Sequence, residues 1–304
     1  MPLKELTKAD VLAYIDGKIG AFSVSEIKEG LGITSLSGKK NVYVHLGRLE
    51  IDGIVEKISP GIYRLKNAKK VVMAWGEADL NSNLKINLPF GLDNLCKLYP
   101  RSIIIVAGGK NAGKTAFLLD CIARNAGIND LEFFNSETGA EQLKARFNNL
   151  GVAWPAFFPT YECYDHFADQ YTPDKLGIID YLDMNSEVYR SGEEIDKLFR
   201  VTKNCVIIGM QLPPPSVSLY KGKKQIITRD LAYGGGFTAK RAALYISMHI
   251  IAKNQGILKI VYCKTPMNPK VNPNNMQWTY NFDENGLFTN IQPYYEVADE
   301  DADV

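Results

Sequence analysis

The chain has 304 residues and a formal net charge of +1, with 46% hydrophobic and 23% charged residues. This composition is ordinary for a globular protein, and the length favours two domains over one. The near-neutral charge balance excludes a polycationic protein, so any nucleic-acid surface must come from charge that is segregated within the chain.

Cysteines and apolar runs narrow the class of protein further. The five cysteines are scattered without a Cys-x-x-Cys pair, which argues against a zinc site or a disulfide framework and favours a reducing compartment. No apolar run approaches the roughly 18 residues of a membrane span, and the N-terminus lacks a signal-peptide core. We therefore expect a cytoplasmic protein, nucleoid-associated if its host is bacterial or archaeal, with no membrane partner.

Residues 1–70 are expected to form a small separate domain. Capping residues and apolar spacing predict three helices, of which Thr7 caps the first and Ser23 or Ser25 starts the second. Two short β runs then flank Ser59-Pro60-Gly61, which predicts a hairpin. Three helices and a terminal hairpin are typical of a winged helix-turn-helix domain. On its third helix, the polar residues Lys39, Lys40, His45 and Arg48 are expected to face solvent.

The predicted winged helix has two alternative uses, which the sequence leaves open. It would bind DNA if the third helix enters a major groove with Lys39, Lys40 and Arg48, while the hairpin contacts phosphates. It would otherwise serve as a protein-docking or oligomerisation module. Residues 1–70 hold twelve Lys and Arg against eight Asp and Glu, a modest basic surplus.

After a linker at residues 71–88, strands and helices alternate regularly over residues 89–292. Continuous apolar strands that alternate with helices predict an α/β domain, with a mainly parallel sheet covered by helices on both faces. The expected strands are 102–106, 131–134, 177–179 and 205–210, and the expected helices are 114–125, 139–150 and 192–202. Residues 293–304 are expected to form a disordered acidic tail.

The segment from Gly108 to Thr115 reads Gly-x-x-x-x-Gly-Lys-Thr directly after the apolar run Ser102–Val106. Between a buried strand and a helix, this pattern predicts a phosphate-binding loop for ATP, because glycines and a helix start turn backbone amides toward phosphates. Lys114 is expected to contact the β- and γ-phosphates, and the Thr115 hydroxyl to bind Mg²⁺. The expected nucleotide-binding residues are Gly108, Gly109, Lys110, Asn111, Ala112, Gly113, Lys114, Thr115 and Ala116.

Three further polar residues follow predicted strands, at the sheet edge where ligands bind in such folds. Asp180 could reach Mg²⁺ directly or through water, and Glu137 is suited to polarise an attacking water. Gln211 could sense the γ-phosphate and pass that signal to the following loop. Each has a purely structural alternative, as a strand-end or helix-start residue.

These segments together resemble the RecA-fold ATPases. The stretches SETGAEQL at 136–143 and IIDYLD at 178–183 look most like DnaB-type replicative helicases, and Gly234–Arg241 resembles the RecA and RadA recombinases. The resemblance covers roughly residues 88–292. It implies that Glu137 is the catalytic glutamate, Asp180 the Walker-B aspartate and Gln211 the γ-phosphate sensor, in an oligomer with ATP between subunits.

One departure from this pattern lies at Lys264. In DnaB-like enzymes a Lys-x-Arg reaches the neighbouring subunit's nucleotide, whereas here Lys264 is followed by Thr265 and Pro266. Lys264 fits the first position, and the missing arginine favours slow hydrolysis over a fast motor.

The segment from Pro213 to Arg241 is the expected polynucleotide contact. Lysines for phosphates beside aromatic residues for base stacking are typical of single-strand binding. The candidate DNA-binding residues in it are Lys221, Lys223, Lys224, Arg229, Lys240 and Arg241. The alternative is a mobile surface loop with ordinary charges.

The sequence therefore predicts an ATP- and Mg²⁺-dependent DNA-binding ATPase that forms a homo-oligomer, either a filament or a ring. A recombinase-like protein or a recombination mediator that binds single-stranded DNA is favoured, with duplex DNA as the alternative. A DnaB-like hexameric helicase and a nucleotide-gated scaffold or regulator stay open as other functions.

Overall fold

The computed structural model describes residues 6–16, 18, 20–66, 73–152, 158–182, 190–220 and 223–295, without the side chains of residues 217–226. The chain divides into two compact units, residues 1–78 and 79–304. None of the helices in the described ranges is long and apolar enough to cross a membrane.

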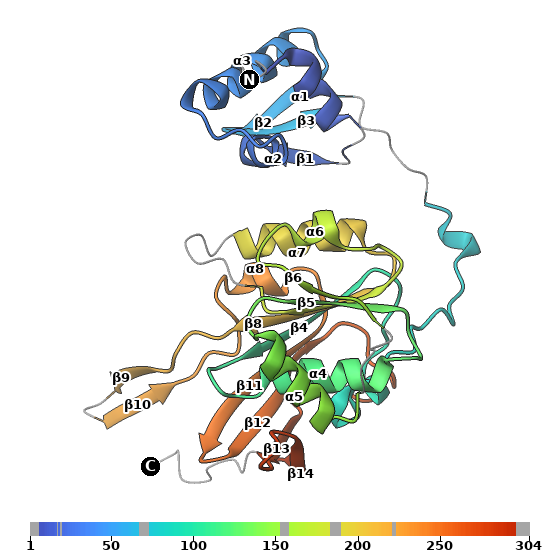
Figure 1. Ribbon diagram of the computed structural model, residues 1–304, viewed down its shortest axis with the longest axis vertical. Helices are drawn as coiled ribbons and strands as arrows, with labels where there is room; N and C mark the ends of the chain where they lie inside the picture. The colour runs from blue at the N-terminus through green and yellow to red at the C-terminus, as the bar shows by residue number, and fades with distance from the viewer. Residues whose placement is uncertain are drawn as a thin grey trace. The chain divides into compact units, whose positions relative to one another are not determined.

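The first unit is a three-helix domain with a small antiparallel sheet in the order β1-β3-β2 (Figure 1). Thr7 and Ser23 both form capping boxes, so the polar residues at these positions end the preceding extended chain and start the helices. The elements are α1 (Lys8–Ile15), β1 (Ala21–Ser23), α2 (Val24–Gly30), α3 (Leu36–Ile51), β2 (Val55–Ser59) and β3 (Ile62–Leu65).

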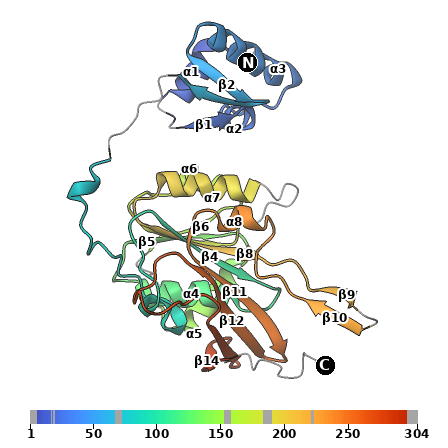
Figure 2. The same ribbon diagram turned by 180° about the vertical axis from the view of Figure 1, so that it is seen from behind.

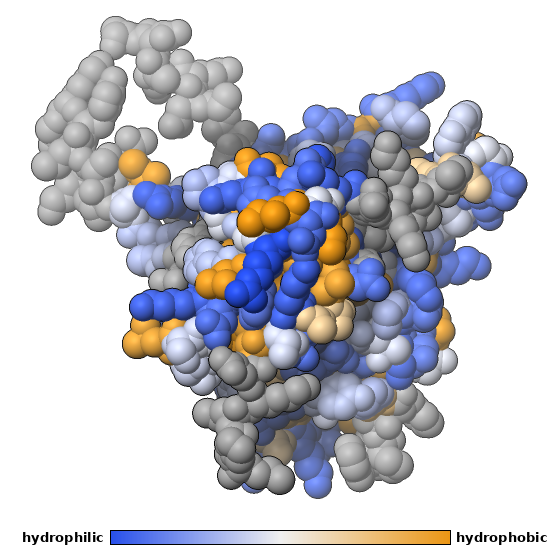
Figure 3. All heavy atoms as spheres, turned by 90° about the horizontal axis from the view of Figure 1, so that it is seen from above, coloured by the Kyte–Doolittle hydropathy of each residue, from blue (hydrophilic) through white to orange (hydrophobic). Residues whose placement is uncertain are grey.

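The expectation that His45 faces solvent is wrong. His45 lies on the same stripe of α3 as Val42 and Leu49, which are fully buried, and its Nε2 lies 2.9 Å from the carbonyl oxygen of Leu6. Helical spacing, rather than side-chain polarity, decided which face this residue occupies. Other apolar residues of α3 remain exposed, including Leu36 and Ile51, and Figure 3 shows hydrophobic side chains interspersed with hydrophilic ones on the face it views.

The second unit contains a nine-stranded sheet in the order β14-β13-β12-β11-β4-β8-β7-β5-β6. The strands from β11 through β4 to β6 pair in parallel, and β12 to β14 extend the sheet with antiparallel pairs. This mainly parallel sheet confirms the predicted α/β class. It also continues to Tyr294, so the sheet ends two residues later than the expected boundary at 292. Residues 296–304 of the expected acidic tail lie outside the described residues.

The bounds of the elements in this unit are β4 (Ser102–Gly108), α4 (Lys114–Asn125), β5 (Leu131–Asn135), α5 (Ala140–Asn149), β6 (Thr160–Glu162), α6 (Phe167–Gln170), β7 (Leu176–Asp180), α7 (Arg190–Val201), β8 (Cys205–Gln211), β9 (Ser216–Tyr220), β10 (Lys223–Ile227), α8 (Gly236–Ala239), β11 (Ala242–Ala252), β12 (Gln255–Cys263), β13 (Gln277–Phe282) and β14 (Phe288–Tyr294). Short 3-10 turns lie at Trp75–Glu77 and Pro89–Asn94.

Alternate side chains of the central strand β4 enter two different cores. Ile104 and Val106 pack with α4 and α5 on one face, and Ile103 and Ile105 pack with α6 and α7 on the other. Every residue of β4 is buried, as expected for the middle of a covered parallel sheet. The sheet is therefore a rigid base from which the loops after β4, β5, β7 and β8 emerge at one edge.

The hairpin β9–β10 leaves this body after β8. Figures 1 and 2 both show it projecting away from the sheet, so the segment expected as one loop from Pro213 to Arg241 contains a two-stranded ribbon followed by the short helix α8. The five paired positions run from Lys223 opposite Tyr220 to Ile227 opposite Ser216.

Candidate functional site

The loop between β4 and α4 is held in one backbone conformation by its neighbours. Gly113 precedes α4 with a φ of 92°, and a Cβ there would lie 2.5 Å from the Phe282 ring, so glycine is required. A Cβ on Gly108 would lie 2.5 Å from Cγ of Lys114. The buried Tyr280 hydroxyl donates a hydrogen bond of 2.6 Å to the carbonyl oxygen of Ala112. These contacts with neighbouring side chains restrict the backbone conformation of the loop.

Lys114 lies at the start of α4 and is almost completely buried. Its Nζ donates a hydrogen bond of 2.9 Å to Oε1 of Gln211 at the end of β8. Burial lowers the pKa of Lys114, while the charges of Glu137 and Asp180 act in the opposite direction. A buried ammonium group at the start of a helix, beside a phosphate-binding loop, is suited to an anion such as a phosphate.

Asp180 ends β7 with a side chain that is fully buried, and its two carboxylate oxygens accept no hydrogen bond from the residues that the structure describes. Burial raises the pKa of Asp180 to about 6, with a further contribution from Glu137, while Thr115, Lys114 and Arg146 act against this rise. A buried carboxylate without a donor is costly, and a metal ion would compensate it.

The sheet register brings the other predicted residues to the same edge. Gly108 pairs with Gln211 and Asn135 pairs with Asp180, so the loops after four strands begin side by side. The hydroxyl of Thr115 donates a hydrogen bond of 3.2 Å to Oε2 of Glu137. Lys114, Thr115, Glu137, Asp180 and Gln211 therefore lie in one cluster around the loop. Thr115 and Asp180 supply the hard oxygen donors that Mg²⁺ prefers.

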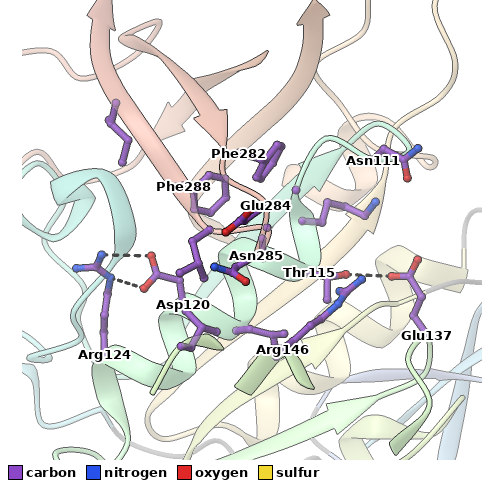
Figure 4. Close-up of a pocket in the computed structure, with 18 residues that line it drawn as sticks. Asn111, Thr115, Asp120, Arg124, Glu137, Arg146, Phe282, Glu284, Asn285 and Phe288 are labelled. Carbon is purple, nitrogen blue, oxygen red and sulfur yellow. Dashed lines mark hydrogen bonds and ion pairs between the residues drawn. The ribbon is translucent and has the colours of Figure 1, made fainter. Parts of the chain in front are cut away.

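A pocket of about 600 Å³ extends from this cluster along α4 (Figure 4). This volume lies in the range of small-molecule sites. Its lining includes the charged side chains of Lys114 and Glu137 and the rings of Phe282 and Phe288, which lie beside Gly113 with their centroids 5.2 Å apart. The pocket is lined by Asn111, Gly113, Lys114, Thr115, Ala116, Leu119, Asp120, Arg124, Glu137, Arg146, Leu150, Phe282, Glu284, Asn285, Gly286, Leu287, Phe288 and Ile291. The charged side chains suit the phosphates of a nucleotide, and the aromatic rings suit its base.

Sequence reasoning missed the residues that close this pocket, namely Arg146 on α5 and the aromatic residues of β13 and β14. No motif marks them. A signal for Arg146 does exist, because it follows the buried Leu143 by three residues and therefore shares its inward face of α5. Nothing comparable marks Phe282 and Phe288, which reach the pocket only because β13 and β14 extend the sheet.

Lys264 does not lie in this cluster. It follows β12, is exposed, and its backbone nitrogen donates to the carbonyl oxygen of Ala243 beside the start of β11. The neighbouring Leu244 pairs with Ile104, near the start of β4, whereas the phosphate loop follows the end of β4. Lys264 therefore lies at the opposite edge of the sheet, and its expected contact with another subunit's nucleotide stays a prediction.

The candidate DNA-binding residues are dispersed. Lys39, Lys40 and Arg48 are exposed on α3, and Arg229 and Lys240 are exposed after β10. Arg241 is partly buried, forms an ion pair of 2.6 Å with Asp196 and lies 4.6 Å from the ring centroid of Phe199. Lys221 lies outside the described residues, and the side chains of Lys223 and Lys224 are not described.

The base of the hairpin is attached directly to the phosphate loop. The backbone nitrogen of Leu212 donates to Gly108, that of Tyr233 donates to Gln211, and that of Gly109 donates to Met248. On the returning chain, Asp230 accepts hydrogen bonds from His249, Lys259 and Ser247 at 3.2, 2.8 and 2.8 Å. The donors, His249 foremost, hold the pKa of Asp230 well below its usual range. Both ends of the hairpin are thus fixed close to the loop.

Comparisons with known proteins bear on the fold of the chain. No protein-family model matches the chain, and no curated protein matches its sequence. Among solved structures, a DnaB-like replicative helicase studied with primase matches at a TM-score of 0.50 and 15% identity, over 71% of this chain and 66% of that chain. The RadB recombinase matches at a TM-score of 0.42 and 12% identity, over 62% of this chain and 90% of that chain. A KaiC-like protein of Pyrococcus horikoshii matches at a TM-score of 0.47 and 15% identity, over 70% of this chain and 99% of that chain.

The match at a TM-score of 0.50 and the strand order establish a RecA-like α/β fold for the chain, which confirms the predicted fold. At 15% identity this match shows the fold alone. The function therefore depends on the chemistry of the site.

Proposed function

We propose that the chain is an ATPase that binds ATP with Mg²⁺ at the phosphate loop. The observation that carries this proposal is the buried Asp180 carboxylate, which has no donor among the described residues and lies beside Thr115 and Lys114. A protein that did not bind a cation there would gain stability by replacing this aspartate. The pocket of about 600 Å³ has room for the nucleoside, and its lining includes the rings of Phe282 and Phe288.

Each residue of the cluster has a defined task in hydrolysis. Lys114 would contact the phosphates, Gln211 accepts a hydrogen bond from Lys114 and would lie by the terminal phosphate, and Thr115 and Asp180 would hold the metal ion. Mg²⁺ would offset charge on the phosphate oxygens. Glu137 orients a water, whose oxygen forms a bond to the γ-phosphorus while the bond to the β–γ bridging oxygen breaks. The electron pair stays on ADP, and the water proton passes to Glu137.

ATP turnover and nucleotide binding test this function together. We expect Lys114→Ala to abolish both, because the loop loses its only buried cation. Glu137→Gln is expected to retain binding and lose turnover, because it keeps the shape of the site and removes the proton acceptor. Unchanged turnover in Lys114→Ala would refute the assignment of the site.

We further propose that the hairpin β9–β10 binds single-stranded DNA in an ATP-dependent manner, within a homo-oligomer of the recombinase or recombination-mediator type. Its sequence includes Tyr220, Lys221, Lys223 and Lys224, and its base hydrogen-bonds to Gln211 and Gly108. A change at the γ-phosphate would therefore reach the base of the hairpin through Gln211. Lys264, at the opposite sheet edge, would contact the nucleotide of the next subunit.

Fluorescence anisotropy with labelled single-stranded DNA tests the hairpin. We expect tighter binding with a non-hydrolysable ATP analogue than with ADP, and weaker binding with a flatter salt dependence for the Lys223→Ala, Lys224→Ala double variant. An equal salt slope in the double variant would refute the role of the hairpin.

The helicase alternative rests on the match to a DnaB-like replicative helicase. Strand displacement from a forked duplex would favour it over a recombinase. The scaffold alternative rests on the first unit, whose order α1-β1-α2-α3-β2-β3 supports the proposal of a winged helix. Tight binding of one duplex sequence, with turnover that single-stranded DNA leaves unchanged, would favour the scaffold.

A further inference from the structure

Two arginines line the pocket from neighbouring helices, and they differ in their partners. Arg124 of α4 forms an ion pair of 2.8 Å with Asp120, one helical turn earlier. Arg146 of α5 is partly buried and makes no ion pair with any residue that the structure describes. The first arginine is therefore compensated within its own helix, and the second is available to a ligand.

The side chain of Arg146 is directed to the phosphate end of the pocket. Figure 4 shows it extending from α5 toward Thr115 and Glu137. Arg146 thus reaches the cluster from α5, whereas Lys114 reaches it from the start of α4.

The charge balance of the site calls for a second cation. Lys114 faces two carboxylates, Glu137 and Asp180, even before a nucleotide with several negative charges is added. A guanidinium group stays protonated under all relevant conditions and matches phosphate oxygens with two parallel donors. A partly buried arginine without a carboxylate partner is stabilised when such an anion binds beside it.

We propose that Arg146 binds the terminal phosphate of the nucleotide held by its own chain. It would offset the charge that develops on the phosphoryl oxygens while the bond to the leaving group breaks. This inference rests on the proposed ATPase function and adds an arginine supplied in cis. Lys264, the cation expected from a neighbouring subunit, lies at the other edge of the sheet.

Nucleotide affinities separate a contact with the terminal phosphate from one with the rest of the nucleotide. The probes are Mg²⁺ with AMP-PNP and Mg²⁺ with ADP, titrated against the full chain, Arg146→Gln and the control Lys144→Gln. Lys144 is exposed on the same helix and does not line the pocket, so its replacement removes the same charge elsewhere. We expect Arg146→Gln to weaken AMP-PNP binding about tenfold or more and ADP binding less than about threefold.

Turnover gives the second readout. An arginine that offsets transition-state charge accounts for about 10³-fold or more in rate, so Arg146→Gln is expected to lower kcat by at least about 100-fold. The kcat of Arg146→Lys is expected to lie between those of the parent protein and Arg146→Gln, because lysine keeps the charge and loses the paired donors. Unchanged ADP affinity shows in each case that the variant is folded.

The inference is overturned if Arg146→Gln behaves like Lys144→Gln in both measurements. It is also overturned if AMP-PNP and ADP lose affinity equally while kcat stays unchanged, because Arg146 would then contact a part that both nucleotides share. Failure of the ATPase proposal looks different, since Lys114→Ala would then leave the binding of both nucleotides intact.

Discussion

Two aspartates at the same edge of the sheet lie in opposite environments. Asp180 is fully buried without a donor, and burial raises its pKa to about 6. Asp230 accepts three hydrogen bonds at the base of the hairpin, and its pKa lies well below the usual range. This edge of the sheet therefore has two kinds of carboxylate. Asp180 destabilises the free protein and is suited to a cation, and Asp230 fixes the hairpin to the sheet.

The largest expected effect is on turnover in Asp180→Asn. The amide keeps the shape but loses the charge that would hold Mg²⁺, so we expect kcat for ATP to fall by about 10³-fold or more. Steady-state phosphate release at saturating Mg²⁺ measures this. Asp130→Asn, an exposed carboxylate just before β5, is the matched control and should retain the rate of the parent protein. Comparable rates in the two variants would remove Asp180 from the site.

Asp230→Asn is expected to affect stability, whereas Asp180→Asn affects turnover. Asn keeps one acceptor oxygen for Ser247 and His249, but it removes the charge and places an NH2 group opposite the Lys259 ammonium, which should lower the free energy of unfolding by about 2–4 kcal/mol. Urea denaturation followed by circular dichroism measures the change. A loss below about 0.5 kcal/mol would show that the cluster is not what fixes the hairpin.

The pH dependence of stability should separate the two carboxyls. Asp180 has a folded pKa above its ordinary 3.8, so the unfolded chain loses this proton first and stability falls as pH rises from about 4 to about 6. Asn at this position should therefore add up to about 3 kcal/mol of stability at pH 8 and almost nothing at pH 4. Asp230 has a lowered pKa, so its contribution is complete above about pH 4 and is lost as pH falls further. Urea titrations of both variants at pH 3, 4, 6 and 8 measure these differences. If the free energy of unfolding of either variant differed from that of the parent protein by the same amount at every pH, the shifted pKa of that carboxyl would be contradicted.

The smallest effect is expected for Tyr280→Phe. This change removes the hydrogen bond to the carbonyl oxygen of Ala112 behind the phosphate loop and leaves the aromatic packing intact. We expect a loss of about 1 kcal/mol in stability and a weakening of ADP binding by several-fold. Calorimetry with ADP measures the second quantity. Full ADP affinity in the variant would show that Tyr280 does not hold the loop in its binding conformation.

The sequence predicted the part of the site that local patterns define. The strand before Gly108, the helix starting at Lys114 and the positions of Asp180 and Gln211 all follow from apolar runs that end in polar residues. Local patterns could not predict the aromatic part of the pocket lining, because Phe282 and Phe288 reach the pocket through the pairing of β12, β13 and β14. The error at His45 has a different origin, because its spacing from Val42 and Leu49 already placed it on the buried face of α3.

The central claim is that Asp180 is retained at a cost in stability because it holds the cation of a bound nucleotide. Urea denaturation at pH 8, with and without Mg²⁺ and AMP-PNP, tests it directly in the parent protein and Asp180→Asn. We predict that the variant is the more stable without ligand and that the ligand stabilises only the parent protein. A variant that is less stable without ligand, and equally stabilised by it, would contradict the account.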